Sequence, residues 1–118
     1  MGDESVEKKK HFRLLQAVKD FLRDQPGDVK QELNSIIWKL EIDGMLTSPY
    51  GEKVSNDDRL FAIRVIQAGN IRVFYVYGIQ DSVIGLHGYV KKTEEIPQHE
   101  LDHARKIVSQ LIAAGVVE

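Results

Sequence analysis

The sequence predicts an α+β fold, in which a small antiparallel sheet packs against two N-terminal helices and is followed by a C-terminal helix. Between residues 59 and 93, three apolar runs rich in β-branched and aromatic residues are separated by turn segments at residues 69–70 and 78–81. This pattern predicts a three-stranded antiparallel meander. Apolar residues at helical spacing precede and follow the meander, so we expect helices to pack on the sheet.

The chain begins with a charged segment that gives way to a helical pattern. Residues 1–10 contain three lysines and no apolar core, so we predict a flexible tail rather than a signal peptide. Residues 11–118 are expected to form a single domain. Apolar residues recur at helical spacing over residues 12–23, which predicts the first helix, and a short strand over residues 11–15 is the alternative.

The second helix is predicted over residues 28–43. Asp28, followed three residues later by Gln31, is typical of a helix start, and Gly44 is a natural stop. The apolar residues of this segment form one stripe, which should face the core. The stripe contains Val29, Leu33, Ile36, Ile37 and Leu40.

The remaining segments are a loop and a last helix. Residues 45–58 are rich in turn-forming residues, so we predict a loop there. Pro97 favours the first turn of a helix that ends near Gly115. The predicted apolar face of this helix contains Leu101, Ala104, Val108, Leu111 and Ile112.

Composition excludes several classes of function. The chain has no cysteine, which excludes disulfides, thiol nucleophiles and cysteine-based metal sites. No apolar stretch approaches the roughly 18–20 residues that span a bilayer, so we expect a cytoplasmic protein without membrane contact. His99 and His103 have the spacing of a metal-binding pair, but the sequence places no third ligand. We therefore expect no metal and no other cofactor.

Charge is unevenly distributed along the chain, whose formal net charge is −2. Residues 59–93 contain five basic residues and one acid, Asp81. The rest of the chain carries 11 of the 16 basic residues and 17 of the 18 acidic residues. Positive charge concentrated on one sheet predicts a phosphate-binding surface, and phosphate on a sheet indicates RNA.

Alternation along the predicted strands places five polar side chains on one face of the sheet. In the third strand, the apolar residues Ile84, Leu86 and Val90 should face the helices, and the polar residues should face away. A charged Arg72 is costly to bury without a partner, so it should also lie on the open face. The predicted water-facing surface contains Arg64, Arg72, His87, Tyr89 and Lys91.

This set of residue types suits the cleavage of RNA by its own 2′-hydroxyl group. The reaction requires a base, an acid for the departing 5′-oxygen, and cations over the phosphorane. Arginine binds two phosphate oxygens and stays protonated, histidine or lysine can exchange a proton, and tyrosine can stack on a base. The predicted RNA-binding residues are Arg64, Arg72, Tyr89 and Lys91.

Several motifs occur in a fixed order along the chain: AVKDFL (residues 17–22), Ile63-Arg64, GNIRVFY (69–75), LHGYVKKT (86–93), and Pro97 with Glu100. Together they resemble the phage-derived, HigB-type branch of the RelE/ParE toxin superfamily. Members of this family usually begin with a clear first strand, whereas residues 11–23 look more helical than extended.

The resemblance implies a RelE-like fold and the toxin of a type II toxin–antitoxin system. Such toxins cleave translated mRNA on the ribosome without a metal, and a small helix-turn-helix antitoxin of the HigA type restrains them. By position, Arg64 and Arg72 match the strand arginines of the family, and Lys91 and Lys92 match its basic motif. The resemblance thus implies that Arg72 binds phosphate, and it leaves proton transfer to His87, Lys91 or Lys92.

Two other interpretations fit the same sequence. A ParE-like toxin inhibits DNA gyrase through protein contact and cleaves no RNA. A toxin-like module without catalytic activity would only bind a partner.

Overall fold

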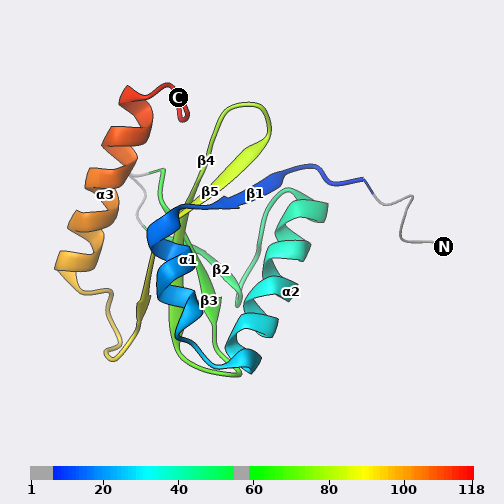
Figure 1. Cartoon of the computed structure of the whole chain (residues 1–118), viewed down its shortest axis with the longest axis vertical. Helices are drawn as coiled ribbons and strands as arrows, with labels where there is room; N and C mark the ends of the chain where they lie inside the picture. Colours follow the sequence, from blue (N-terminus) through cyan, green and yellow to red (C-terminus); the bar gives the residue numbers. More distant parts are fainter. Residues whose placement is uncertain (1–6, 55–58) are drawn as a thin grey trace.

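The computed structural model describes residues 7–54 and 59–118 of the chain (Figure 1). This part contains three helices and five strands. In chain order they are β1 (His11–Leu14), α1 (Gln16–Arg23), α2 (Gly27–Asp43), β2 (Gly51–Lys53), β3 (Phe61–Val65), β4 (Ile71–Tyr77), β5 (Ser82–Val90) and α3 (Gln98–Ala113).

The five strands form one mixed sheet in the order β1-β5-β4-β3-β2. β3, β4 and β5 form the antiparallel meander that the sequence predicts, and β2 pairs with β3, also antiparallel. β1 pairs with β5 in the parallel sense, so the prediction of an antiparallel sheet is wrong at this edge. The predicted α+β class is confirmed.

The start of the chain follows the alternative prediction of a short strand. β1 occupies residues 11–14, and the first helix begins at Gln16 instead of Phe12. Phe12 and Leu14 pack against the core, while His11 and Arg13 are exposed. The backbone N–H of Phe12 donates to Glu41 Oε2 of α2 at 2.8 Å, so a side chain binds the edge of β1 that β5 leaves unpaired.

The described part of the predicted tail is bonded to α2. Lys9 and Lys10 donate their backbone N–H groups to the carbonyl oxygen of Glu41, at 2.8 and 3.1 Å. The ammonium group of Lys8 lies 3.0 Å from Glu41 Oε1. Glu41, which is 8% exposed, therefore fixes residues 8–12 through both its side chain and its backbone. Residues 1–6 of the predicted tail lie outside the described residues.

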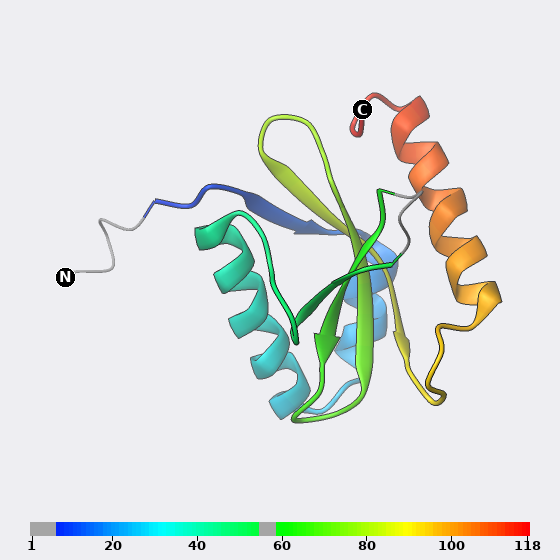
Figure 2. The ribbon, with the colours of Figure 1, turned by 180° about the vertical axis from the view of Figure 1, so that it is seen from behind.

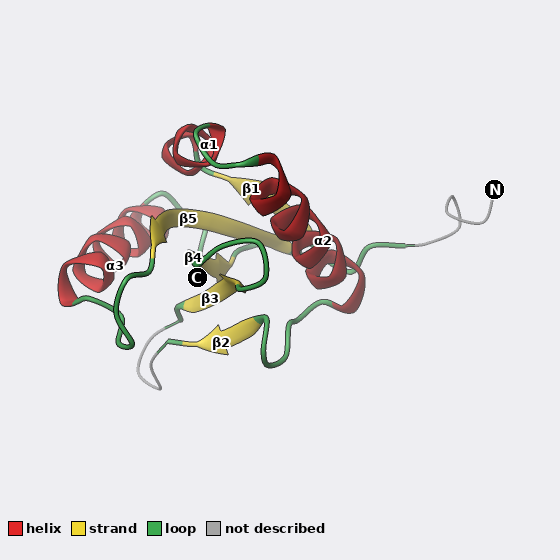
Figure 3. Ribbon diagram, turned by 90° about the horizontal axis from the view of Figure 1, so that it is seen from below, coloured by secondary structure: helices red, strands yellow, loops and turns green. Residues whose placement is uncertain are grey.

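The helices cover both faces of the sheet (Figures 2 and 3). α1 and α2 pack on one face, and α3 packs on the other. The three predicted helices are thus present, with α2 and α3 close to their predicted bounds. Beyond α3, the backbone N–H of Ile79 donates to the carbonyl oxygen of Val116 at 3.0 Å, which joins the C-terminal segment to the β4–β5 turn.

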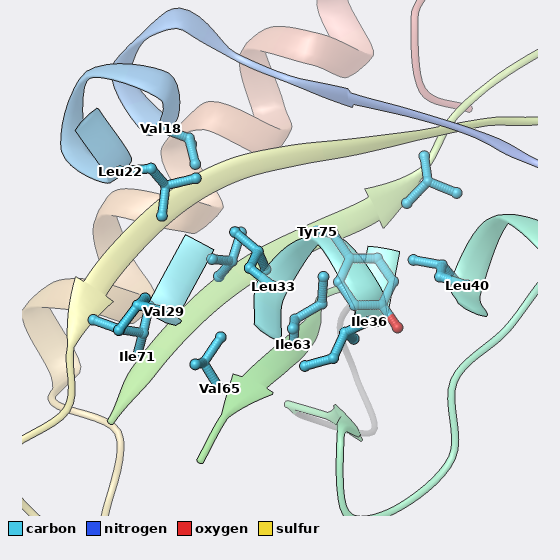
Figure 4. Close-up of a cluster of buried hydrophobic side chains, with 12 residues drawn as sticks. Val18, Leu22, Val29, Leu33, Ile36, Leu40, Ile63, Val65, Ile71 and Tyr75 are labelled. Atoms are coloured by element: carbon cyan, nitrogen blue, oxygen red, sulfur yellow. The ribbon is translucent and has the colours of Figure 1, made fainter. Parts of the chain in front are cut away.

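The core under α1 and α2 is apolar (Figure 4). The predicted stripe of α2 supplies Val29, Leu33, Ile36 and Leu40, all buried, and Gly44 ends the helix in the left-handed conformation at φ 81°. Gly88 of β5 allows α1 to approach the sheet closely, because a Cβ atom there would lie 2.9 Å from the ring of Phe21.

The core under α3 mixes apolar and polar side chains. Phe74, Leu86 and Tyr89 are buried there. Ala104 is the only buried residue of α3, a helix that the structure describes in full. Leu101 and Leu111 of its predicted apolar face are half-buried, so α3 packs less completely than α2.

An irregularity in β5 changes which side chains share a face. Phe74 pairs with His87 while the next residue, Tyr75, pairs with Gly85, so Leu86 is one extra residue in β5. The extra residue breaks the strict alternation of the strand. Consequently Ile84 and Leu86 lie on the same face as Tyr89, and the prediction that they point the other way is wrong.

A second correction concerns residues 45–58, which the sequence predicts as loop. Residues 51–53 form β2, and Glu52 pairs in register with Ala62. A strand of three residues is too short to show alternation, which explains why the sequence pattern misses it. The predicted turn residues 55–58 lie outside the described residues.

Candidate functional site

Two arginines lie directly opposite each other on adjacent strands of the meander. Arg64 of β3 pairs in register with Arg72 of β4, and Arg72 pairs on its other side with Tyr89 of β5. Two residues further along β4, Phe74 pairs with His87. The strand register therefore brings Arg64, Arg72, His87 and Tyr89 onto the α3 face, and the sequence predicts this grouping.

The arginine pair shares a carboxylate from the neighbouring strand. Like charges directly opposite each other destabilise a sheet. Glu52 of β2 offsets this repulsion, because its Oε1 lies 3.5 Å from Nε of Arg72 and 3.9 Å from Nε of Arg64. Burial and then the charge of Arg64 lower the pKa of Arg72 from its usual value, while Glu52 acts in the opposite direction.

The surface is less open than the sequence predicts. The side chain of Arg72 is 4% exposed and Tyr89 is 5% exposed, whereas the side chain of Arg64 is 32% exposed. The expectation of a water-facing Arg72 assumed that no partner compensates its buried charge. Instead, one terminal nitrogen of Arg72 donates to Asn70 Oδ1 and to the carbonyl oxygen of Ile71, at 3.4 and 3.3 Å.

Three buried polar atoms at this site have no hydrogen-bond partner within the described part of the chain. They are Nε of Arg64, Nε of Arg72 and the hydroxyl oxygen of Tyr89. Such atoms are rare in folded proteins and call for an explanation. Burial raises the pKa of Tyr89 to about 12, although Arg72 opposes the shift, so the hydroxyl group is a neutral donor at pH 7. Each of the three atoms can donate a hydrogen bond.

His87 belongs to a second cluster at the start of α3. Its Nε2 lies 2.6 Å from Oε1 of Glu100, and its ring packs against Phe74, Tyr89 and His103. A carboxylate in this position orients the imidazole ring by hydrogen bonding to one of its nitrogens. The pair is suited to hold or transfer a proton beside the arginines.

Lys91 and Lys92 follow the end of β5 and form the outer part of the predicted set. The ammonium group of Lys91 donates to the carbonyl oxygen of Glu94, and its backbone N–H donates to the carbonyl oxygen of Asn70. Within the described ranges, no hydrogen bond or ion pair joins either lysine to Arg64 or Arg72. Asn70 links the two regions, because its side chain contacts both Arg72 and the backbone of Lys91.

The partners of the predicted residues are Glu52, Asn70 and Glu100, for which the sequence alone predicts no role at the site. In the sequence, Glu52 lies in a predicted loop, Asn70 in a predicted turn and Glu100 in one of the motifs that carry the resemblance. The positive charge of residues 59–93 is therefore offset in space by acids from outside that segment.

Within the described residues, no group of three or more His, Asp or Glu side chains is arranged to hold a metal ion. His99 and His103 instead contact Glu100 and His87 respectively. Within the same residues, no helix is both long enough and apolar enough to cross a membrane.

The fold and the site define a small α+β protein with a mixed sheet and two opposed arginines, of which Arg72 is buried. Residues 20–109 match the family described as phage derived protein Gp49-like (DUF891), and the chain belongs to this family. The Gp49-like family is associated with toxins of toxin–antitoxin systems. The chain has no significant match among curated proteins.

Proposed function

We propose that this protein is the toxin of a type II toxin–antitoxin system and cleaves translated mRNA on the ribosome. In this proposal residues 11–118 form a single domain with the RelE-like arrangement, and the protein belongs to the HigB-type branch of these toxins. Family membership supports the toxin assignment. The observation that carries the RNA assignment is the pair of opposed arginines, Arg64 and Arg72, whose Nε donors are unused.

The chemistry assigned to the site needs no group from outside the chain. The 2′-oxygen attacks phosphorus, the bond to the 5′-oxygen breaks, and the products are a 2′,3′-cyclic phosphate and a 5′-hydroxyl group. Arg64, which is partly exposed, contacts the phosphate first, and Arg72 adds charge from beneath it. Negative charge that grows on the phosphorane is stabilised by these cations more strongly than the ground state is.

Proton transfer falls to His87, with Glu100 holding its ring, or to Lys91 or Lys92 at the end of β5. Tyr89 supplies a neutral hydroxyl donor beside Arg72. Lys91 and Lys92 also lie where they extend the cationic surface along an RNA strand. The partners we assign are the ribosome with its mRNA and a HigA-like helix-turn-helix antitoxin, all in the cytoplasm.

A second candidate is a toxin-like module that binds a partner without catalysis. The burial of Arg72 and Tyr89 and the two carboxylates at the site favour it, because each reduces access to the cations. In this case the arginine pair is a structural element of the α3 face.

Mapping of RNA 5′ ends after controlled induction distinguishes these functions. We expect new ends within translated codons for the wild type. Arg64→Ala and Arg72→Met should each reduce the yield of these new RNA ends about 100-fold or more, as loss of one transition-state donor does. Methionine keeps most of the volume of the buried arginine. Arg13→Ala removes an exposed charge from β1 and should cleave like the wild type.

One result would contradict the role of the arginines, and two would contradict the nuclease assignment itself. Wild-type cleavage by folded Arg64→Ala and Arg72→Met variants would show that the arginines take no part in the reaction. Intact mRNA together with a DNA-damage response indicates a gyrase-binding toxin. Intact mRNA with unaffected growth indicates the non-catalytic module.

A further inference from the structure

We propose that Glu52 is an internal counter-anion, which occupies the phosphate position between Arg64 and Arg72 until an RNA phosphodiester displaces it. The inference rests on the proposed function, because it takes the arginine pair as a phosphate site. It assigns to Glu52 control of the affinity for RNA, and it requires no chemical step.

The first argument is the position of Glu52 in the sheet. β2 is an edge strand of three residues that pairs only with β3. Its pairing with Ala62 places Glu52 on the same face as the arginines. The side chain of Glu52 is 36% exposed, so the carboxylate already reaches water from this position.

The second argument is the geometry of the contact. One oxygen, Oε1, lies near both Nε atoms, yet neither Nε atom makes a hydrogen bond. A well-fitted carboxylate–guanidinium pair uses two parallel hydrogen bonds instead. Glu52 therefore balances the charge of the arginines and leaves their buried donors unsatisfied. A ligand that also satisfies these donors has an advantage over the carboxylate.

The third argument is that other groups position the arginines. A terminal nitrogen of Arg64 donates to the carbonyl oxygen of Pro49 at 3.1 Å. A terminal nitrogen of Arg72 is bonded to Asn70 and to the backbone of Ile71. These contacts remain when Glu52 moves away, so the two guanidinium groups stay side by side for an incoming anion.

A phosphodiester is the anion class that fits this exchange. It carries one negative charge, as the carboxylate does, and two non-bridging oxygens that can accept from separate donors. Because only the state without bound Glu52 accepts the phosphate, the apparent affinity is reduced by the fraction of molecules in that state. Neutralising Glu52 should therefore strengthen RNA binding.

The test compares Glu52→Gln with Glu7→Gln, which makes the same change at an exposed residue in the N-terminal segment. The probe is a fluorescein-labelled single-stranded RNA decamer with 2′-O-methyl riboses, which resists cleavage by this chemistry. Fluorescence anisotropy at fixed ionic strength gives Kd. We expect Glu52→Gln to bind at least about fivefold more tightly than the wild type, the lower end of ordinary coupling between sites. Glu7→Gln should match the wild type.

If Glu52→Gln binds RNA as the wild type does or more weakly, while Arg64→Ala still weakens binding, the role given to Glu52 is wrong. The phosphate site itself is then unaffected. If Arg64→Ala and Arg72→Met bind RNA as the wild type does, the phosphate site itself is wrong. Should Glu52→Gln fail to fold, the wild type provides the test. Addition of RNA should shift the side-chain carboxylate ¹³C resonance of Glu52, and an unmoved resonance with bound RNA would contradict displacement.

Discussion

The two faces of the sheet differ in how completely they are packed and in how polar their side chains are. Under α1 and α2, buried side chains from both helices and from the sheet form a continuous apolar core. Under α3, one helix with a single buried residue covers a face that also holds Arg72, Tyr89 and His87. The contrast teaches that the more completely packed core and the cluster of charged and polar side chains lie on opposite faces of the sheet.

The largest expected effect compares the same substitution on the two faces. Leu40→Ala empties a fully buried position of α2, and Leu111→Ala trims a half-buried residue of α3. We expect Leu40→Ala to lower the free energy of unfolding by about 3–5 kcal/mol, the upper part of the range for buried leucine. Leu111→Ala should cost about 1–2 kcal/mol, because less apolar surface is lost.

Urea unfolding followed by circular dichroism measures both values. Equal losses for the two variants would contradict the unequal packing of the faces. A larger loss for Leu111→Ala would reverse the comparison.

The next effect concerns the His87–Glu100 pair on the α3 face. Glu100→Gln keeps a hydrogen-bond acceptor for His87 and removes the carboxylate that orients its ring. If His87 transfers a proton, single-turnover cleavage should slow by about 10-fold or more, a part of the roughly 10²–10⁴-fold contribution of general acid–base catalysis, because the imidazole ring itself remains.

His99→Ala is the matched control, because His99 is the other contact of Glu100 and its side chain is 80% exposed. This variant should cleave at the wild-type rate. If Glu100→Gln cleaves RNA at the wild-type rate, proton transfer would be assigned to Lys91 or Lys92.

A smaller effect is expected at Glu32, on the side of α1 and α2. Its carboxylate accepts backbone N–H groups of Ile66, Gln67 and Ala68, which hold the β3–β4 connection. Burial acts to raise the pKa of Glu32, but these three N–H groups outweigh it and hold the pKa below its usual value. Glu32→Ala should cost about 1–2 kcal/mol at pH 7, since part of the lost bonding is replaced by water.

The pH dependence of this cost has a defined sign. The pKa of Glu32 is lower in the folded protein than in the unfolded chain, so its contribution is present above the unfolded pKa near 4.5. The contribution is lost as pH falls through the folded pKa. The difference between wild type and Glu32→Ala should therefore be constant from pH 7 to about 5.5 and shrink in acid. A difference that grows in acid would contradict the assignment.

The smallest effect is expected at Lys92, which is exposed beyond β5. Lys92→Ala should weaken RNA binding modestly and reduce the salt dependence of log Kd by about 0.7, the value for one phosphate contact on a single strand. Titrations at several salt concentrations measure this slope. Lys19→Ala on α1 should leave it unchanged, and an equal effect of both variants would indicate unspecific attraction.

The sequence predicts those parts of the fold that repeat over many residues. The meander, α2 and α3 follow from sustained alternation or helical spacing. β1 was ambiguous because Phe12 fits both periods, and its partner strand is about 70 residues away in the chain. β2 and the extra residue Leu86 in β5 depend on pairing between strands, which no local pattern encodes.

One part of the site was predictable from the sequence and another part was not. Arg64 and Arg72 share a face because strand register follows from the short turn between them. Their burial and the contact with Glu52 depend on how β2 and α3 fold back over the sheet, so charge counting along the chain could not reveal them. The sequence thus predicts that Arg64 and Arg72 lie together and does not predict their contact with Glu52.

A chemical-shift map tests the division between the two faces most directly. The wild type is labelled with ¹⁵N and titrated with the cleavage-resistant RNA decamer, and the amide and arginine side-chain resonances are followed. We predict shifts that cluster at Glu52, Arg64, Arg72 and His87, with α1 and α2 unchanged. If saturating RNA shifts the resonances of α1 and α2 and leaves the arginine side-chain resonances unchanged, the account is contradicted.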